Sequence, residues 1–349
     1  MKYQNDIDKM NTNRNLFLMS LPIFVELLLQ LLVGNVDQMM VSRVSQPSVA
    51  AIVNANQIMN LVIIVLSMAS TAVTVILSQY LGAQDEKNAS RTCMVSLVLI
   101  GGVSLAATIL VFAGHTPLYR AIHVPEEVFD EASLYLLIVG AFILVQGLYL
   151  TFSAMIRAFA MVKEVMIISV IMNVMNIVGN AILINGWFGM PQLGAVGAAI
   201  STDISKLVGL ALMIGMFFKS RRVKMGMSYL RPFPVQILKN LCLLAIPTGV
   251  ESFSYNLSQM IILGIVNSFG TLVTVTKGYC TIFANIDYVY AMAIATATQI
   301  VLGYLIGARR LNDIQKRVNA TLKVAIAACV GMAVLMCLGG KYIFLIFTD

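Results

Sequence analysis

Nine long apolar runs with few charged residues constrain this chain more than any other feature. They cover about residues 16–42, 49–79, 94–114, 132–156, 165–187, 193–218, 240–266, 272–303 and 321–347. A helix needs about 20 mostly apolar residues to cross a hydrocarbon core. The 349 residues are 59% apolar and only 11% charged, against roughly 45–50% and 25% in a soluble domain. The sequence therefore predicts an all-α polytopic membrane protein and excludes a water-soluble enzyme.

The basic residues gather at alternate ends of these predicted spans. Eighteen of the 23 Lys and Arg residues fall on the side of the amino terminus. Only Arg43, Arg120 and Lys341 fall on the other side, which also carries an acidic loop over residues 126–131. Short loops rich in Lys and Arg stay in the cytoplasm. We therefore expect a multi-pass protein of the plasma (inner) membrane, with its amino terminus cytoplasmic and residue 349 extracytoplasmic.

The chain contains an internal repeat at an offset of 225 residues. Leu-Pro-Ile-Phe-Val-Glu at 21–26 recurs as Ile-Pro-Thr-Gly-Val-Glu at 246–251, and Leu-Gly-Ala at 81–83 recurs as Ile-Gly-Ala at 306–308. One unit contains six spans, so both copies enter the membrane in the same orientation. This predicts a parallel two-lobe protein with a six-helix bundle over 1–230. The first three helices of an incomplete second bundle would occupy 231–349, which makes a second chain that supplies the missing spans a candidate partner.

Several motifs, taken in order along the chain, resemble those of one transporter family. They are Pro22 and Val36-Asp37, Gln79-Tyr80-Leu81-Gly82-Ala83, Arg157-Ala158 with Lys163, Asn173 with Asn176 and Asn180, the Gly-rich stretch 186–199 that contains Trp187 and Pro191, and Ile246-Pro247-Thr248-Gly249-Val250-Glu251. Each motif is weak alone, but their order and spacing cover essentially the whole chain. In these features the chain resembles the bacterial multidrug and toxic compound extrusion (MATE) transporters.

This resemblance implies two six-helix bundles arranged as a V, alternating access, and export of amphipathic, often cationic, compounds in exchange for H⁺ or Na⁺. Apart from the coupling ion, it implies no cofactor. It also implies a cation site in the amino-terminal bundle, where Asp37 matches the acid of the family and Asn176 matches an asparagine. Asn180 stands where many relatives carry aspartate, and Ala160 stands where the family usually has glycine.

Asp37 is the main candidate for binding the coupling cation. Ionisable groups inside a membrane cost about 2.5–3.5 kcal/mol on insertion scales, so they usually line a cavity or have a partner. The alternative is a structural acid that accepts hydrogen bonds from Asn176 and Asn180. Asn173, Asn176 and Asn180 share one helix face. There they either line a cavity with Asp37 or hold neighbouring helices together.

Four further acids in the apolar runs are candidates for a substrate site or a second cation site, namely Glu26, Asp203, Glu251 and Asp287. Glu26 and Glu251 share a repeat position, where they are either partly solvated or face each other across the cleft. Asp203 and Lys206 are one helical turn apart, which favours an internal ion pair. Asp287 lies deep in the eighth run and is a candidate ligand for the substrate cation or the coupling cation.

The other patterns exclude several classes of function. The sequence has no GxxxxGK phosphate loop, no nucleophile–base constellation and no His or Cys spacing typical of a metal site, and its charge of +7 reflects topology, not nucleic-acid binding. We therefore predict an antiporter for an amphipathic or cationic small molecule. One alternative is a lipid-linked sugar or phospholipid flippase, although five acids within the predicted spans, against Lys206 and Lys277, favour cationic cargo. The other is a truncated, nontransporting remnant or scaffold subunit.

Overall fold

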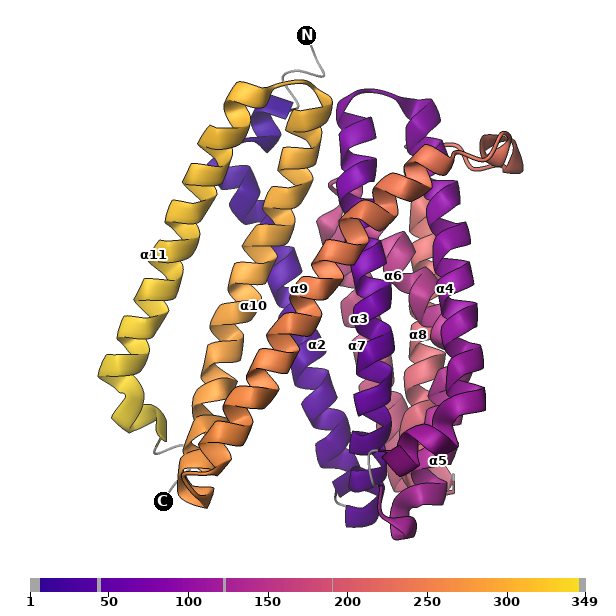
Figure 1. The fold of residues 1–349 in the computed structure, drawn as a ribbon, viewed down its shortest axis with the longest axis vertical. Helices are drawn as coiled ribbons and strands as arrows, with labels where there is room; N and C mark the ends of the chain where they lie inside the picture. Colours follow the sequence, from indigo (N-terminus) through magenta and orange to yellow (C-terminus); the bar gives the residue numbers. More distant parts are fainter. Residues whose placement is uncertain (1–6, 43–44, 122–123, 190, 345–349) are drawn as a thin grey trace.

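The protein is a bundle of long helices. The computed structural model describes residues 7–42, 45–121, 124–189 and 191–344 (Figure 1). The helices are α2 (Asn13–Ser42), α3 (Gln46–Gly82), α4 (Glu86–Ala121), α5 (Glu126–Ala141), α6 (Ile143–Ala158), α7 (Val162–Asn185), α8 (Gly194–Ser220), α9 (Val235–Asn267), α10 (Thr271–Gly307) and α11 (Leu311–Phe344), with short 3-10 helices η1 (Trp187–Gly189) and η2 (Met227–Leu230). No strand occurs within these ranges. The predicted all-α class is confirmed.

The helices follow from the apolar runs, because lipid offers the backbone no hydrogen-bond partners and a helix satisfies them internally. In the described part of the chain, seven helices are long and apolar enough to span a membrane, and the bent pair of α5 and α6 would bring the number to eight. The 33-residue helix α9 does not belong to that set, because Thr248, Glu251 and the polar residues that follow them dilute its apolar stretch.

The run at 132–156, expected as one span, is divided between two helices. The chain leaves helical geometry at Phe142, where φ is −99° and ψ is 10°, and α5 and α6 meet at an angle of 46°. The N–H of Phe142 donates to the carbonyl of Val139 at 3.2 Å. This i to i−3 bond tightens the last turn of α5, so the chain bends here without a proline.

The internal repeat is visible in the backbone. Helices α3 and α10 are each 37 residues long, and both their first and last residues are 225 positions apart. Pro22 and Pro247, which are one repeat apart, both lie inside helices. Gln84 and Arg309, also one repeat apart, both have left-handed backbones, with φ of 56° and 57°. The predicted parallel repeat is therefore confirmed in three dimensions.

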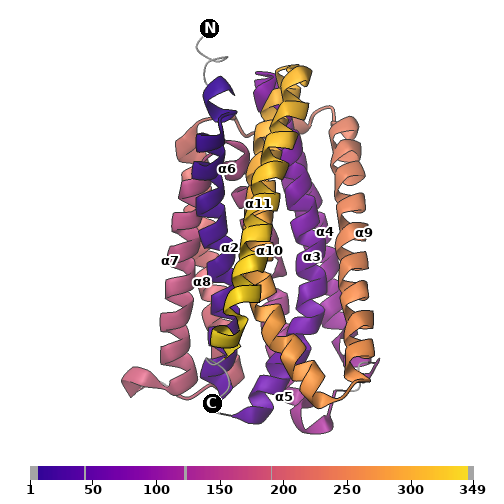
Figure 2. The same cartoon turned by 90° about the vertical axis from the view of Figure 1, so that its left-hand side faces the viewer.

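The two copies of the repeat meet through α3 and α10. Helices α4 to α8 lie on one side of α2 and α3, whereas α10 and α11 lie on the other (Figures 1 and 2). A Cβ atom on Gly82 would lie 2.5 Å from the carbonyl oxygen of Tyr304, and one on Gly307 would overlap the carbonyl oxygen of Gln79. These contacts are one repeat apart, so they surround the axis that relates the copies. Only glycine fits at both positions.

Three hydrophobic clusters hold the fold together. The first joins α3, α4, α5 and α8, and the second joins α3, α4, α6, α7, α8 and α9. The third packs the amino-terminal segment and α2 against α10, through Ile7, Leu16, Met19, Ile23, Ala297 and Ile300. The amino-terminal segment is thus part of the contact between the two copies of the repeat.

Replacing Ala160 by glycine is expected to stabilise the protein by about 1 kcal/mol. Ala160 connects α6 to α7 with φ of 61°, and a left-handed backbone costs an L-residue roughly 1–2 kcal/mol, part of which the entropy of unfolded glycine offsets. Detergent-induced unfolding would measure the change. As the matched control, Ala327→Gly in the exposed part of α11 should destabilise by about 0.5–1 kcal/mol. Destabilisation by both variants would contradict the backbone argument.

Candidate functional site

A row of buried amides runs along α7 and continues onto α8. Asn173, Asn176 and Asn180 are all buried. Nδ2 of Asn180 donates to Oδ1 of Asn176 at 3.4 Å, and Nδ2 of Asn176 donates to Oγ1 of Thr202 at 3.1 Å. Oγ of Ser201 also donates to the Asn176 carbonyl at 2.9 Å. Asn176 therefore joins α7 to α8, as one of the two alternatives expected, whereas the lining of a cavity by these amides together with Asp37 stays a prediction.

Thr202, at the α8 end of this row, also lines a cavity in the amino-terminal bundle. The cavity has a volume of about 120 Å³, and its polar lining comprises Asn56, Tyr135, Thr202 and Lys206, from α3, α5 and α8. Gly34 of α2 closes one side. Water occupies about 30 Å³ per molecule in the liquid, so this space suits a few waters or a small ion. It is well below the roughly 300–1,000 Å³ of a drug-sized site.

Asp37 belongs to α2 and follows Gly34 by three residues. One helical turn is 3.6 residues, so the position of Asp37 is about one turn along the helix from a residue that borders the cavity. The side chain of Asp37 lies outside the described part of the structure. Its assignment as the acid of the cation site stays a prediction.

Glu26 is paired with Arg157, a partner that the sequence did not indicate. Nη2 of Arg157 lies 2.5 Å from Oε1 of Glu26, and the Glu26 side chain is only 1% exposed. Arg157 is the next-to-last residue of α6, so a guanidinium group from the end of this helix pairs with the carboxylate of Glu26 in the middle of α2. Oε2 of Glu26 has no hydrogen-bond partner among the described residues. The pair therefore neutralises a buried acid while leaving one of its oxygens available.

The same end of α6 contacts α10. The hydroxyl of Tyr304 donates to the carbonyl of Ala158 at 2.9 Å, and this bond is buried. Ala158 directly follows Arg157, so the ion pair inside the amino-terminal bundle sits one residue from a hydrogen bond between the two copies of the repeat. The ring of Phe24 also packs edge-on against Tyr290 of α10, with centroids 5.6 Å apart. A change at Glu26 is therefore well placed to reach α10.

The other candidate acids do not gather around this centre. Glu251 is exposed on α9, whereas Glu26 is buried and paired with Arg157, so the alternative of partial solvation is wrong for Glu26. That the two acids face each other across the cleft stays a prediction. Asp203 is buried, and neither of its carboxylate oxygens has a hydrogen-bond partner in the described ranges. The ion pairs among the described residues do not include Asp203 and Lys206, so the expected direct pair is not formed, although the charge of Lys206 acts on Asp203 from a distance. Asp287 is half-buried on α10, beside the thiol of Cys329 on α11.

Comparison with known proteins decides the family. The sequence model of the MatE family matches residues 22–182 and 247–349. The chain belongs to the MATE transporter family. It is 34% identical to an uncharacterized transporter of Bacillus subtilis, YisQ, over 96% of this chain and 74% of that protein. It is 28% identical to a probable multidrug resistance protein, NorM, of Chromobacterium violaceum, over 83% of this chain and 63% of that protein.

Solved MATE structures share the fold. A MATE crystal structure in the bent conformation has a TM-score of 0.88 and 20% identity, over 98% of this chain and 76% of that one. A MOP superfamily transporter from Pyrococcus furiosus has a TM-score of 0.86 and 20% identity, over 98% of this chain and 76% of that one. This MATE chain spans about three quarters of YisQ and less than two thirds of NorM. Its membership makes it a multi-pass membrane transporter protein.

Proposed function

We propose that this MATE protein exports amphipathic, cationic small molecules from the cytoplasm in exchange for inward H⁺ or Na⁺. The observation that carries the proposal is the cavity of about 120 Å³ lined by Thr202, which continues the amide row of Asn180 and Asn176. Its size suits a coupling ion and excludes a drug. Relatives named as probable multidrug resistance proteins support the choice of cargo.

Thr202 lines the cavity, and Asn176 and Asn180 lie behind it in the amide row. Oxygen atoms of Asn176, Asn180 and Thr202 are the ligands that a hard cation such as Na⁺ prefers, but none of them can carry a proton at neutral pH. Under this proposal Asp37 supplies the carboxylate for either ion. Lys206 also lines the cavity, and its positive charge lowers the affinity for the coupling cation, which favours release of the ion after each cycle.

The proposed orientation places the amino terminus in the cytoplasm of a cell with a plasma (inner) membrane. The connections α3–α4, α8–α9 and α10–α11 lie at the same end of the helices as the amino terminus (Figure 1). Arg222 and Arg310 lie in these connections, Lys87 and Lys219 lie in the helix ends beside them, and 18 of the 23 Lys and Arg residues fall on this side. Because Lys and Arg in short loops are retained in the cytoplasm, this end is the cytoplasmic one.

Replacing Asp37 by asparagine is expected to abolish export. The amide keeps the size of the side chain but can neither bind a cation by charge nor exchange a proton, so the bound ion would no longer drive the change of conformation. Efflux of a fluorescent cationic dye from cells that express the protein measures this, with the expected rate equal to that of cells without it.

The matched control is Asp130→Asn, which removes an exposed carboxylate near the start of α5 and should leave efflux unchanged. Membrane quantities of the three proteins must be compared, so that loss of transport is separated from loss of expression. Export by D37N at the parent rate would show that coupling does not pass through Asp37.

A further inference from the structure

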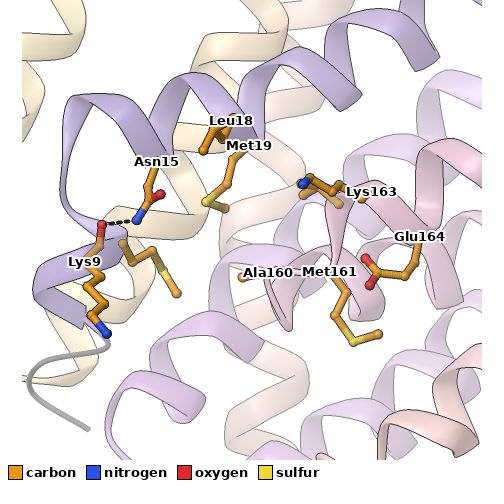
Figure 3. A pocket seen from close by; sticks show the side chains of 10 residues that line it. Lys9, Asn15, Leu18, Met19, Ala160, Met161, Lys163 and Glu164 are labelled. Carbon is orange, nitrogen blue, oxygen red and sulfur yellow. Dashed lines mark hydrogen bonds between the residues drawn. The ribbon is translucent and has the colours of Figure 1, made fainter. Parts of the chain in front are cut away.

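A second and larger cavity opens at the amino-terminal end of the molecule. It has a volume of about 400 Å³ and lies between the segment before α2 and the loop that joins α6 to α7 (Figure 3). Lys9 borders it from the first of these, and Lys163 and Glu164 border it from the first turn of α7. The cavity thus collects charged groups from two elements that are far apart in the sequence.

The charge of this cavity is suited to an anion. Two lysines, Lys9 and Lys163, and one acid, Glu164, line the cavity, which leaves one positive charge in excess. The ion pairs of the described residues include neither lysine. Nδ2 of Asn15, which also lines the cavity, donates to the backbone carbonyl of Lys9. This bond holds the backbone of Lys9 at the cavity edge while its side chain keeps all three N–H donors for a ligand.

The rest of the wall is apolar and continues into the surface that would face lipid. Met10, Met161 and Val162 line the cavity. Leu18, also in the wall, is 41% exposed, and Ile167 on the next turns of α7 is 52% exposed. The charged groups therefore lie where the exposed apolar faces of α2 and α7 begin, which is where headgroups meet a membrane helix. A soluble anion would use only the lysines, whereas a lipid would use both parts.

We propose that this cavity binds the phosphate of an anionic phospholipid, held between Lys9 and Lys163, with the acyl chains along the exposed faces of α2 and α7. Clusters of basic residues at helix ends attract anionic lipids, with about 1 kcal/mol for each Lys or Arg near the surface. The apolar wall selects a lipid over inorganic phosphate, because burying acyl groups adds to the attraction between charges.

The bound lipid would also steady the contact between the two copies of the repeat. The residue before Lys9, Asp8, forms an ion pair with Arg310 in the α10–α11 connection, and Nη1 of Arg317 on α11 donates to the carbonyl of Asn11 at 3.1 Å. The segment that supplies Lys9 therefore ties α2 to α11. Fixing Lys9 by a headgroup keeps this tie in place, which links lipid composition to the equilibrium between transporter conformations.

The test is the apparent melting temperature of the full chain in an uncharged detergent, titrated with dioctanoyl-phosphatidylglycerol, dioctanoyl-phosphatidylcholine or inorganic phosphate. We expect saturable stabilisation by phosphatidylglycerol only. Lys9→Gln and Lys163→Gln should each weaken the apparent affinity about fivefold, the equivalent of about 1 kcal/mol for each lysine. Glu164→Gln, which removes the opposing carboxylate, should strengthen it.

The matched control removes the same charge at the same end of the molecule, outside the cavity. Lys87 and Lys239 are both exposed, and the double variant K87Q/K239Q should bind phosphatidylglycerol as the parent does. An equal loss in this control would overturn the proposal, because binding would then follow net charge alone. Equal stabilisation by inorganic phosphate, or unchanged affinity in the double variant K9Q/K163Q, would overturn it as well.

Discussion

Replacing Gly307 by alanine is expected to push α10 away from α3 and to lower the free energy of unfolding by about 3 kcal/mol, the upper end of the usual cost of overpacking. The added Cβ would overlap the carbonyl oxygen of Gln79 and would lie 2.7 Å from the backbone nitrogen of Ala83. Both are backbone atoms, so no side chain can rotate away. Gly82→Ala should cost a similar amount, because its Cβ would lie 2.5 Å from the Tyr304 carbonyl oxygen.

The controls for this prediction are two glycines in the neighbouring helices α9 and α11. Gly264 in α9 and Gly331 in α11 have nothing within 4 Å of an added Cβ, so alanine there should be neutral or stabilise by up to about 1 kcal/mol through its better helix propensity. Unfolding in mixed micelles with increasing dodecyl sulfate would compare the four variants. If Gly307→Ala behaved as Gly331→Ala does, the close approach of α3 and α10 would not be a feature of the stable state.

The same contact is expected to matter for transport. Under the alternating access that the family resemblance implies, the contact of α3 with α10 at Gly82 and Gly307 would open and close, and a methyl group between the backbones would disfavour the closed form. A cysteine cross-link between the two helices near this end should therefore form more slowly in Gly307→Ala than in Gly331→Ala. This readout separates a shifted conformational equilibrium from a general loss of stability.

The helices and the repeat could be predicted from the sequence, because short stretches of sequence are enough to identify both. Apolar runs of about 20 residues specify membrane helices without knowledge of their neighbours. The offset that pairs Pro22 with Pro247 also relates the ends of α3 and α10, since similar residues at corresponding positions of the repeat end both helices in the same way. The bend at Phe142 was not predicted, because an i to i−3 turn does not change the hydropathy of the sequence and no proline lies at this position.

Side-chain partners were harder to predict, since they depend on how the helices face one another. Asp203 and Lys206 are one turn apart on α8, yet Lys206 lines the cavity beside Tyr135 and Asp203 is buried without a hydrogen-bond partner in the described ranges. Arg157 looked like one of many basic loop residues. Its long side chain instead extends into the bundle, where the guanidinium group pairs with the buried carboxylate of Glu26.

Replacing Arg157 by methionine is expected to lower the free energy of unfolding by about 3–5 kcal/mol, the cost of leaving one charge of a buried pair without its partner. Glu26 is 1% exposed and Arg157 is 21% exposed, at 2.5 Å from each other, so little water can replace the lost guanidinium. The exposed pair of Arg310 and Asp8 serves as the comparison. Its side chains are 30% and 56% exposed, and Arg310→Met should cost less than about 1 kcal/mol.

A double variant separates the charge of the pair from its packing. Glu26→Met combined with Arg157→Met removes both charges and keeps apolar volume at both positions, and buried ion pairs replaced in this way are often neutral or more stable. We therefore expect the double variant to recover most of the stability that R157M loses. Because Ala158 next to Arg157 accepts the hydrogen bond of Tyr304, full stability without dye export would identify the pair as a coupling element. A double variant as unstable as R157M would instead show that Arg157 acts by shape, not by charge.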